Sequence, residues 1–106
     1  MNKEIQLKLL QLLESNKKIS QRNLSSAVGV SLGSVNFMLK ALKEKGLIKL
    51  ENFSTNPNKL QYLYLLTPQG VLEKAKLTYY LLEKKQVEYE LLKKEMDKLQ
   101  VHFVKK

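Results

Sequence analysis

The segment SQRNLSSAVGVSLGSVNFMLKALKEKG, residues 20–46, decides the fold of this chain. Ser20 is a good N-cap for a short amphipathic helix. Three apolar residues then follow at the i, i+3, i+4 spacing of one helix face: Leu24, Ala27 and Val28. Gly29 can take the positive φ that a tight reversal needs, and Val30 can point inward at the corner.

A second, longer helix follows this turn. Ser31 is placed to cap it, and Gly46 is placed to end it as the residue after the C-cap. The residues expected to face inward are apolar and recur at helical spacing: Val35, Met38, Leu39 and Leu42. Two helices joined by a short glycine turn form a helix-turn-helix, whose second helix enters the major groove of DNA. An ordinary helical hairpin shows the same local pattern, so both interpretations stay open at this point.

The length of 106 residues suits one domain with an appended element. Basic residues outnumber acidic residues in this chain. There are 19 Lys and Arg against 10 Asp and Glu, a net charge of +9, which favours nucleic acid as a partner and an anionic membrane surface second. The first 70 residues hold ten basic and four acidic side chains, so +6 of the +9 surrounds the helix-turn-helix. Cysteine is absent, which excludes disulfides and thiolate metal sites.

The N-terminal segment, residues 3–14, has the pattern of another amphipathic helix. Its apolar stripe consists of Ile5, Leu9, Leu12 and Leu13. Leu7 and Leu10 widen this stripe, so we expect either another element of the chain or a partner chain to cover the helix.

After Gly46 the apolar period changes from helix to strand. Residues 47–53 and 60–66 are rich in strand formers, and residues 54–59 between them are turn residues. Two strands directly after a helix-turn-helix predict a β-wing whose tip lies on the DNA backbone or in the minor groove. The wing residues expected to donate hydrogen bonds there are Asn56, Asn58 and Lys59. A solvated hairpin loop is the alternative.

The rest of the chain predicts one long helix, from Pro68 at the first helical position to about residue 104, roughly 55 Å at 1.5 Å per residue. Apolar residues recur in it every seven residues: Ala75, Leu82, Tyr89, Met96 and Phe103. Leu92 and Leu99 occupy d positions of the same heptad. Because such a helix is poorly stable alone in water, we expect a coiled-coil-like homodimer. The expected interface residues are Leu82, Tyr89, Leu92, Met96, Leu99 and Phe103.

The first half of this helix departs from the heptad pattern, since Thr78 and Lys85 occupy d positions. Its additional apolar residues suggest packing against the rest of the chain: Leu77, Tyr79, Tyr80 and Leu81.

The outward face of the helix-turn-helix supplies the candidate DNA contacts. Residues expected to meet base edges are Leu32, Gly33, Asn36 and Phe37. Asn36 can pair bidentately with adenine, and Phe37 can contact a thymine methyl or, alternatively, pack under the wing. Residues expected to contact phosphates are Gln21, Arg22, Ser31, Ser34 and Lys40.

No arrangement of residues in the sequence indicates an enzyme. The single histidine, His102, lies between Val101 and Phe103 with no cysteine or carboxylate arranged around it. Neither a glycine-rich phosphate loop nor metal-ligand spacing occurs, so we expect no catalytic residues, metal or cofactor.

Taken together, these motifs resemble a known family. The order LSSAVGVS (residues 24–31), Val35 and LKEKGLI (residues 42–48) is similar to the winged helix-turn-helix of MarR-type regulators. LLTPQG, residues 65–70, resembles the Leu-Thr-x-x-Gly that follows the wing there. The resemblance covers about residues 18–75, and with the single terminal helix the chain is most similar to small MarR-type regulators associated with exopolysaccharide genes.

The resemblance implies a dimeric, sequence-specific bacterial transcription factor in the cytoplasm, associated with the nucleoid. Ser25 departs from the alanine usual at its position. The chain also has fewer helices than larger MarR proteins, whose extra helices shape a ligand pocket, so the resemblance gives little reason to expect a small-molecule effector.

We therefore predict a mainly α fold with a small β-wing. Residues 1–67 would form a winged helix-turn-helix domain, and residues 68–106 a long C-terminal dimerisation helix. The expected function is transcriptional regulation by a homodimer on double-stranded DNA, with the recognition helix at about residues 31–45 in the major groove and residues 54–59 as the wing. The alternatives are a winged-helix module that docks on a protein of the transcription machinery and, less favoured because glutamates are interleaved, binding of the terminal helix to a membrane surface.

Overall fold

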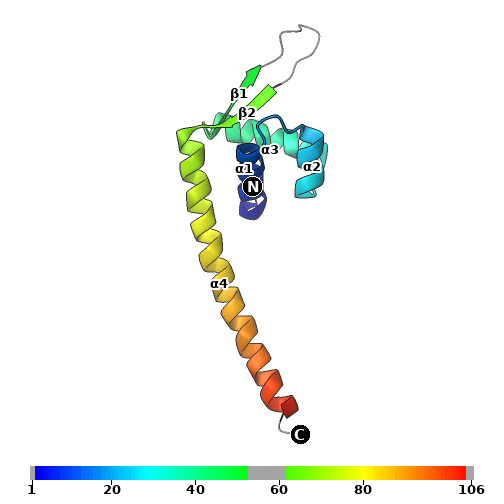
Figure 1. Cartoon of the computed structure of the whole chain (residues 1–106), viewed down its shortest axis with the longest axis vertical. Helices are drawn as coiled ribbons and strands as arrows, with labels where there is room; N and C mark the ends of the chain where they lie inside the picture. The colour runs from blue at the N-terminus through cyan, green and yellow to red at the C-terminus, as the bar shows by residue number, and fades with distance from the viewer. Residues whose placement is uncertain (1, 53–61, 105–106) are drawn as a thin grey trace.

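The computed structural model describes residues 2–52 and 62–104, without the side chains of Tyr62 and residues 101–104. The elements follow in the order α1 (Lys3–Ser15), α2 (Gln21–Val28), α3 (Leu32–Glu44), β1 (Ile48–Asn52), β2 (Tyr62–Leu66) and α4 (Pro68–Val104) (Figure 1). The fold is the predicted one: mainly helical, with a small antiparallel β-wing and a long C-terminal helix. The first three helices gather beside the start of α4, which then extends away from them.

The two helices of the helix-turn-helix end where the sequence predicts. The Ser20 hydroxyl accepts a hydrogen bond from the backbone N–H of Asn23 at 3.0 Å. Gly29 ends α2 with φ of +77°. The Ser25 hydroxyl donates to the carbonyl of Val30, so the residue that departs from the usual alanine ties the turn to the helix before it.

The end of α3 is a Schellman motif. Gly46 has φ of +75°, and its N–H donates to the Lys43 carbonyl at 2.9 Å. The N–H of Leu47 donates to the Leu42 carbonyl at 3.0 Å. Both side chains of this second pair are buried, which adds the hydrophobic contact that usually accompanies the motif. The chain is thereby aimed out of α3 directly into β1.

The core lies where α1, α3, the wing strands and the start of α4 meet. Its fully buried side chains are Leu9, Leu10, Leu13, Leu24, Val35, Leu42 and Ile48, the last at 2% exposure. The four predicted inward residues of α3 are all buried. The expectation for α2 is confirmed in part: Leu24 is buried and Val28 packs half-buried against the core, whereas Ala27 is exposed.

The two strands form an antiparallel pair in which Ile48 lies opposite Leu66 and Leu50 lies opposite Tyr64. The backbone N–H of Tyr64 also donates to the Lys17 carbonyl at 3.0 Å, which joins β2 to the turn before α2. The wing residues Asn56, Asn58 and Lys59 lie outside the described residues.

One residue, Thr67, joins the wing to α4. Its hydroxyl accepts from the N–H of Gly70 at 3.0 Å, as an N-cap, and donates to the Gly46 carbonyl at 2.6 Å. A Cβ at Gly70 would lie 2.0 Å from the Leu47 carbonyl oxygen, so only glycine allows this approach. The Leu-Thr-x-x-Gly pattern is therefore the mark of a tightly packed strand–helix junction.

Two kinds of contact hold the first half of α4 against α1. Leu77 and Leu81 are buried, whereas Tyr79 and Tyr80 remain exposed. Lys3 lies over the ring of Tyr80 at 3.9 Å, Lys74 pairs with Glu14, and Lys85 pairs with Glu4. The predicted packing of this half is confirmed for its two leucines, and α4 is the element that covers α1.

The second half of α4 leaves the body, as Figure 1 shows. The radius of gyration is 19.4 Å, against about 13 Å for a compact chain of this length.

No helix in the described part of the chain combines the length and apolar character needed to cross a membrane.

Candidate nucleic-acid interface

The large apolar side chains on the outward face of α3 are not covered by the described part of the chain. Phe37 is 72% exposed and Leu32 is 46% exposed, while their helical neighbours Val35 and Met38 are buried. Phe37 therefore points into solvent and does not pack under the described part of the wing. Large apolar side chains are costly to expose, so this face is suited to contact with another molecule.

Six of the nine predicted base and phosphate contacts line one shallow hollow of about 450 Å³ between α2 and α3: Gln21, Leu32, Gly33, Asn36, Phe37 and Lys40. The hollow combines two amides, a cation and two apolar side chains. Such a mixture can contact the hydrogen-bonding edges of bases, thymine methyl groups and phosphates.

Gly33 has no structural requirement for glycine that the fold explains. A Cβ built on it meets no heavy atom within 4 Å, and its φ is not positive. Glycine inside a helix is nevertheless unfavourable by about 1 kcal/mol relative to alanine. The absence of a side chain leaves the backbone of the first turn of α3 open to close approach from outside.

Asn36 is half-buried and has a partner within the chain. Its Nδ2 donates to the Gln21 Oε1 at 3.4 Å, and the Gln21 Nε2 donates to the Tyr64 hydroxyl at 3.2 Å. Sequence reasoning missed Tyr64, which lies 43 residues from Gln21 and looks like any strand residue of the wing. β2 packs on α1, and the bond from the Tyr64 N–H to the Lys17 carbonyl holds this strand beside the start of α2, where Gln21 lies.

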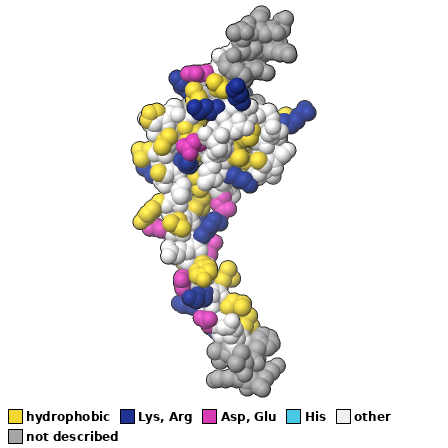
Figure 2. All heavy atoms as spheres, viewed as in Figure 1, with side chains coloured by type: hydrophobic (Ala, Val, Ile, Leu, Met, Phe, Trp, Pro, Cys, Tyr) yellow, Lys and Arg dark blue, Asp and Glu magenta, His cyan; other side chains and the backbone are white. Residues whose placement is uncertain are grey.

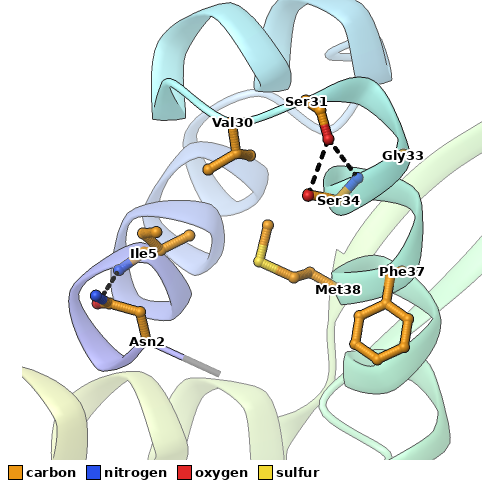
Figure 3. A pocket seen from close by; sticks show the side chains of 8 residues that line it. All are labelled: Asn2, Ile5, Val30, Ser31, Gly33, Ser34, Phe37 and Met38. Atoms are coloured by element: carbon orange, nitrogen blue, oxygen red, sulfur yellow. Dashed lines mark hydrogen bonds between the residues drawn. The ribbon is translucent and has the colours of Figure 1, made fainter.

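The two predicted serines lie at the N-terminus of α3. The Ser31 hydroxyl accepts from the N–H of Ser34 at 3.1 Å and donates to the Ser34 hydroxyl at 2.9 Å, so its first task is to cap the helix. They border a second hollow of about 580 Å³ between α1 and α3, into which Ile5, Val30 and Met38 point (Figure 3).

On the face drawn in Figure 2, Lys and Arg side chains are spread over the winged-helix end of the molecule, with a few acidic side chains among them. Arg22 and Lys40, predicted to contact phosphates, are both exposed. Lys49 on β1 pairs with Glu51 at 3.0 Å.

Among the residues that the structure describes, no group of three or more His, Cys, Asp or Glu side chains is placed to hold a metal ion.

The predicted dimer residues form a separate surface along α4, which begins at Leu82 and continues through the second half of the helix. Leu82, Tyr89, Leu92, Met96 and Leu99 are all between 47% and 67% exposed in the single chain. We call these five residues the α4 stripe. The side chains of Phe103 and His102 lie outside the described residues.

Comparison with protein families identifies the N-terminal part of the chain. Residues 3–49 match the family model for winged helix-turn-helix DNA-binding domains. A search of curated proteins found no match.

Solved structures with the same fold span most of this chain. MepR, a transcription regulator of the Staphylococcus aureus multidrug efflux pump MepA, is 19% identical with a TM-score of 0.62, covering 95% of this chain and 74% of its own. A MepR mutant from S. aureus bound to an oligodeoxyribonucleotide also has a TM-score of 0.62 at 19% identity, covering 93% of this chain and 78% of its own. A MarR family transcription regulator has a TM-score of 0.64 at 19% identity, covering 95% and 68%.

These regulators share the winged body and the long helix that follows it, and the family match lies on the helices that form the hollow described above. Residues 3–49 therefore match winged helix-turn-helix DNA-binding domains, and the chain as a whole has the fold of MarR-family transcription regulators.

Proposed function

We propose that this protein is a sequence-specific transcriptional regulator of the MarR type that binds double-stranded DNA as a homodimer. The observation that carries the proposal is the outward face of α3, where Asn36, Lys40 and the exposed Phe37 border one hollow. In this proposal α3 enters the major groove, with its first turns against base edges. Residues 54–59 follow the backbone or the minor groove.

The phosphate contacts are tested by salt dependence. Affinity for duplex DNA should fall steeply with salt, with a slope of log affinity against log salt of about −0.9 per neutralised phosphate. Lys40→Ala and Arg22→Ala should weaken binding to all sequences and reduce this slope by about 1 each. Lys94→Ala, on the distal part of α4, is the matched control and should leave the slope unchanged. Binding that ignores salt between 50 and 200 mM would refute the proposal.

The homodimer is proposed from the α4 stripe. A long helix that exposes a row of apolar side chains is poorly stable alone in water, and a second copy provides an identical row to cover it. Parallel pairing keeps both winged bodies at one end and sets Glu88 of one chain opposite Lys93 of the other, the charge arrangement typical of g and e positions. Sedimentation should give twice the chain mass at micromolar concentration; a monomer at high micromolar concentration contradicts the dimer.

A dimer of this kind binds two half-sites. Two-fold symmetric helix-turn-helix proteins contact half-sites about 34 Å apart, or a multiple of it, so the operator should be a pseudo-palindrome. The sequence resembles the small MarR-type regulators that are associated with exopolysaccharide genes. We therefore further propose that the controlled genes include those for exopolysaccharide synthesis. Genome-wide footprinting of the bound sites tests both statements, since it returns the operator symmetry and the neighbouring genes together.

The exposed Leu32 and Phe37 favour one second candidate: a winged helix that docks on a protein of the transcription machinery. The two functions differ in their response to random duplex DNA. A DNA-binding domain retains salt-sensitive, sequence-independent affinity for it, whereas a docking module with an incidental basic surface does not.

A further inference from the structure

Three polar side chains from three elements form a short chain of hydrogen bonds behind the hollow of α3. Asn36 belongs to α3, Gln21 to α2 and Tyr64 to β2, and the two bonds between them measure 3.4 and 3.2 Å. Tyr64 is the fixed end, because its side chain is only 6% exposed and its backbone N–H is bonded to the Lys17 carbonyl. Asn36 is the other end and lines the hollow together with Gln21.

The two ends of an amide are chemically different, so the orientation of Asn36 decides what it can recognise. One of its two N–H groups is taken by Gln21. The remaining groups are the Oδ1 acceptor and one N–H donor. Adenine presents a donor and an acceptor together in the major groove, at N6 and N7, whereas guanine presents two acceptors at O6 and N7. An Asn36 held in this way matches adenine and not guanine.

We propose that Gln21 and Tyr64 are positioning residues that set the base preference of Asn36. Tyr64 holds the side chain of Gln21 in place, and the Oε1 of Gln21 then accepts from Asn36 and sets the orientation of its amide. The proposal rests on the DNA-binding function above and assigns Gln21 to this role in place of a phosphate contact. It also makes a residue of the wing strand part of base selection, although Tyr64 itself is too buried to touch DNA.

The same bonds should matter little for folding. Both are longer than the usual 2.9–3.0 Å and involve groups that are only partly buried. Tyr64→Phe keeps the buried ring and removes only the hydroxyl. A change in base preference without a change in melting temperature is therefore the signature of a positioning role.

Substitutions at Gln21 separate the donor and acceptor requirements. Gln21→Glu still accepts from Asn36 and should keep the preference for adenine, although its charge weakens binding to every sequence. Gln21→Leu removes the partner and should lower the discrimination of adenine from guanine by roughly three- to tenfold, part of the 1–3 kcal/mol that a good bidentate pair contributes. Gln21→Lys can only donate, so it should turn the amide of Asn36 over and move the preference toward guanine.

The experiment is selection of bound duplexes from a randomised pool, with the full-length protein and each variant, followed by competition binding of single-base variants. Asn36→Ala first identifies the base position that depends on Asn36. At that position Gln21→Leu and Tyr64→Phe should flatten the preference, Gln21→Glu should retain it, and Gln21→Lys should reverse it.

Two results overturn the inference and leave the proposed function intact: DNA binding in which Asn36→Ala alters no base preference, or variants at Gln21 and Tyr64 that keep the wild-type profile. Failure of the wild-type protein to bind any duplex would instead refute the proposed function.

Discussion

The winged-helix body and the second half of α4 differ in how their apolar side chains are covered. In the body, Leu9, Leu24 and Leu42 are completely buried by other elements of the same chain. In the second half of α4, residues of the same type, such as Leu91 and Leu92, remain 58% and 67% exposed. The body buries its apolar side chains within the chain, whereas the described part of the chain does not cover those of the distal helix. In the proposed function, DNA binding and assembly would therefore lie at different ends of the molecule.

The largest effect should come from truncating a buried residue of the body. Leu42→Ala removes a fully buried side chain and should lower the free energy of unfolding by roughly 2–5 kcal/mol. Leu82→Ala, measured at a concentration low enough to keep the chain monomeric, should change it by about 0.5 kcal/mol or less. Chemical denaturation measures the free energy of unfolding of both variants. Equal losses in the two variants would contradict the difference in burial between the body and α4.

The next effect concerns assembly. Leu92→Lys places a charge in the α4 stripe and should weaken dimerisation by roughly 30- to 100-fold, the range of an interface hot spot. Val87→Lys is the matched control, because Val87 is equally exposed but lies on another face of the helix. Sedimentation equilibrium measures both. Dissociation by both variants would show an interface that surrounds the helix, and dissociation by neither would exclude the α4 stripe.

A smaller effect is expected where the two regions join. Gly70→Ala introduces a Cβ 2.0 Å from the Leu47 carbonyl oxygen and should destabilise the protein by about 1–3 kcal/mol. Gly33→Ala, where a Cβ has free space, should instead stabilise α3 by up to about 1 kcal/mol while weakening DNA binding. Thermal melting and duplex binding of the pair test the two glycines. A stable Gly70→Ala protein would mean that the junction is not constrained.

The smallest effect should come from the ion pairs between α1 and α4. Lys85 and Glu4 are both more than half exposed, so Lys85→Ala should change stability by about 0–1 kcal/mol, and less at high salt. The pair of Lys74 with Glu14 is less exposed at its lysine and should lie at the upper end of that range. A double-mutant cycle for each pair gives the coupling; values well above this range would show that charge, and not Leu77 and Leu81, holds α4 to the body.

Features that depend on a few neighbouring residues were predictable from the sequence. The caps at Ser20 and Ser31 and the glycine ends at Gly29 and Gly46 are local, and so is the start of α4 after Thr67. The inward face of α3 and its exposed Phe37 also follow from helical periodicity, because one element decides them.

Features that depend on which element covers another were not predictable. Ala27 has the spacing of a core residue but no element lies over it. The extra apolar residues in the first half of α4 predicted packing against the body, but not that Leu77 and Leu81 would be buried and Tyr79 and Tyr80 exposed, since that depends on the angle at which α4 leaves Thr67. The bond from Gln21 to Tyr64 joins residues 43 positions apart and requires β2 to be held beside the start of α2.

The junction at Thr67 couples the orientation of α4 to the orientation of the wing. Only Thr67 separates β2 from α4. Its hydroxyl is hydrogen-bonded to the Gly46 carbonyl and to the N–H of Gly70, and Gly70 packs directly on Leu47. Because α4 is about 55 Å long, a tilt of about 5° at Thr67 displaces the C-terminal end of the helix by about 5 Å. In the proposed dimer, a slight change in the angle at which the two α4 helices cross would likewise move the winged bodies by several ångströms. The distance between the two bodies would then be set far from the DNA.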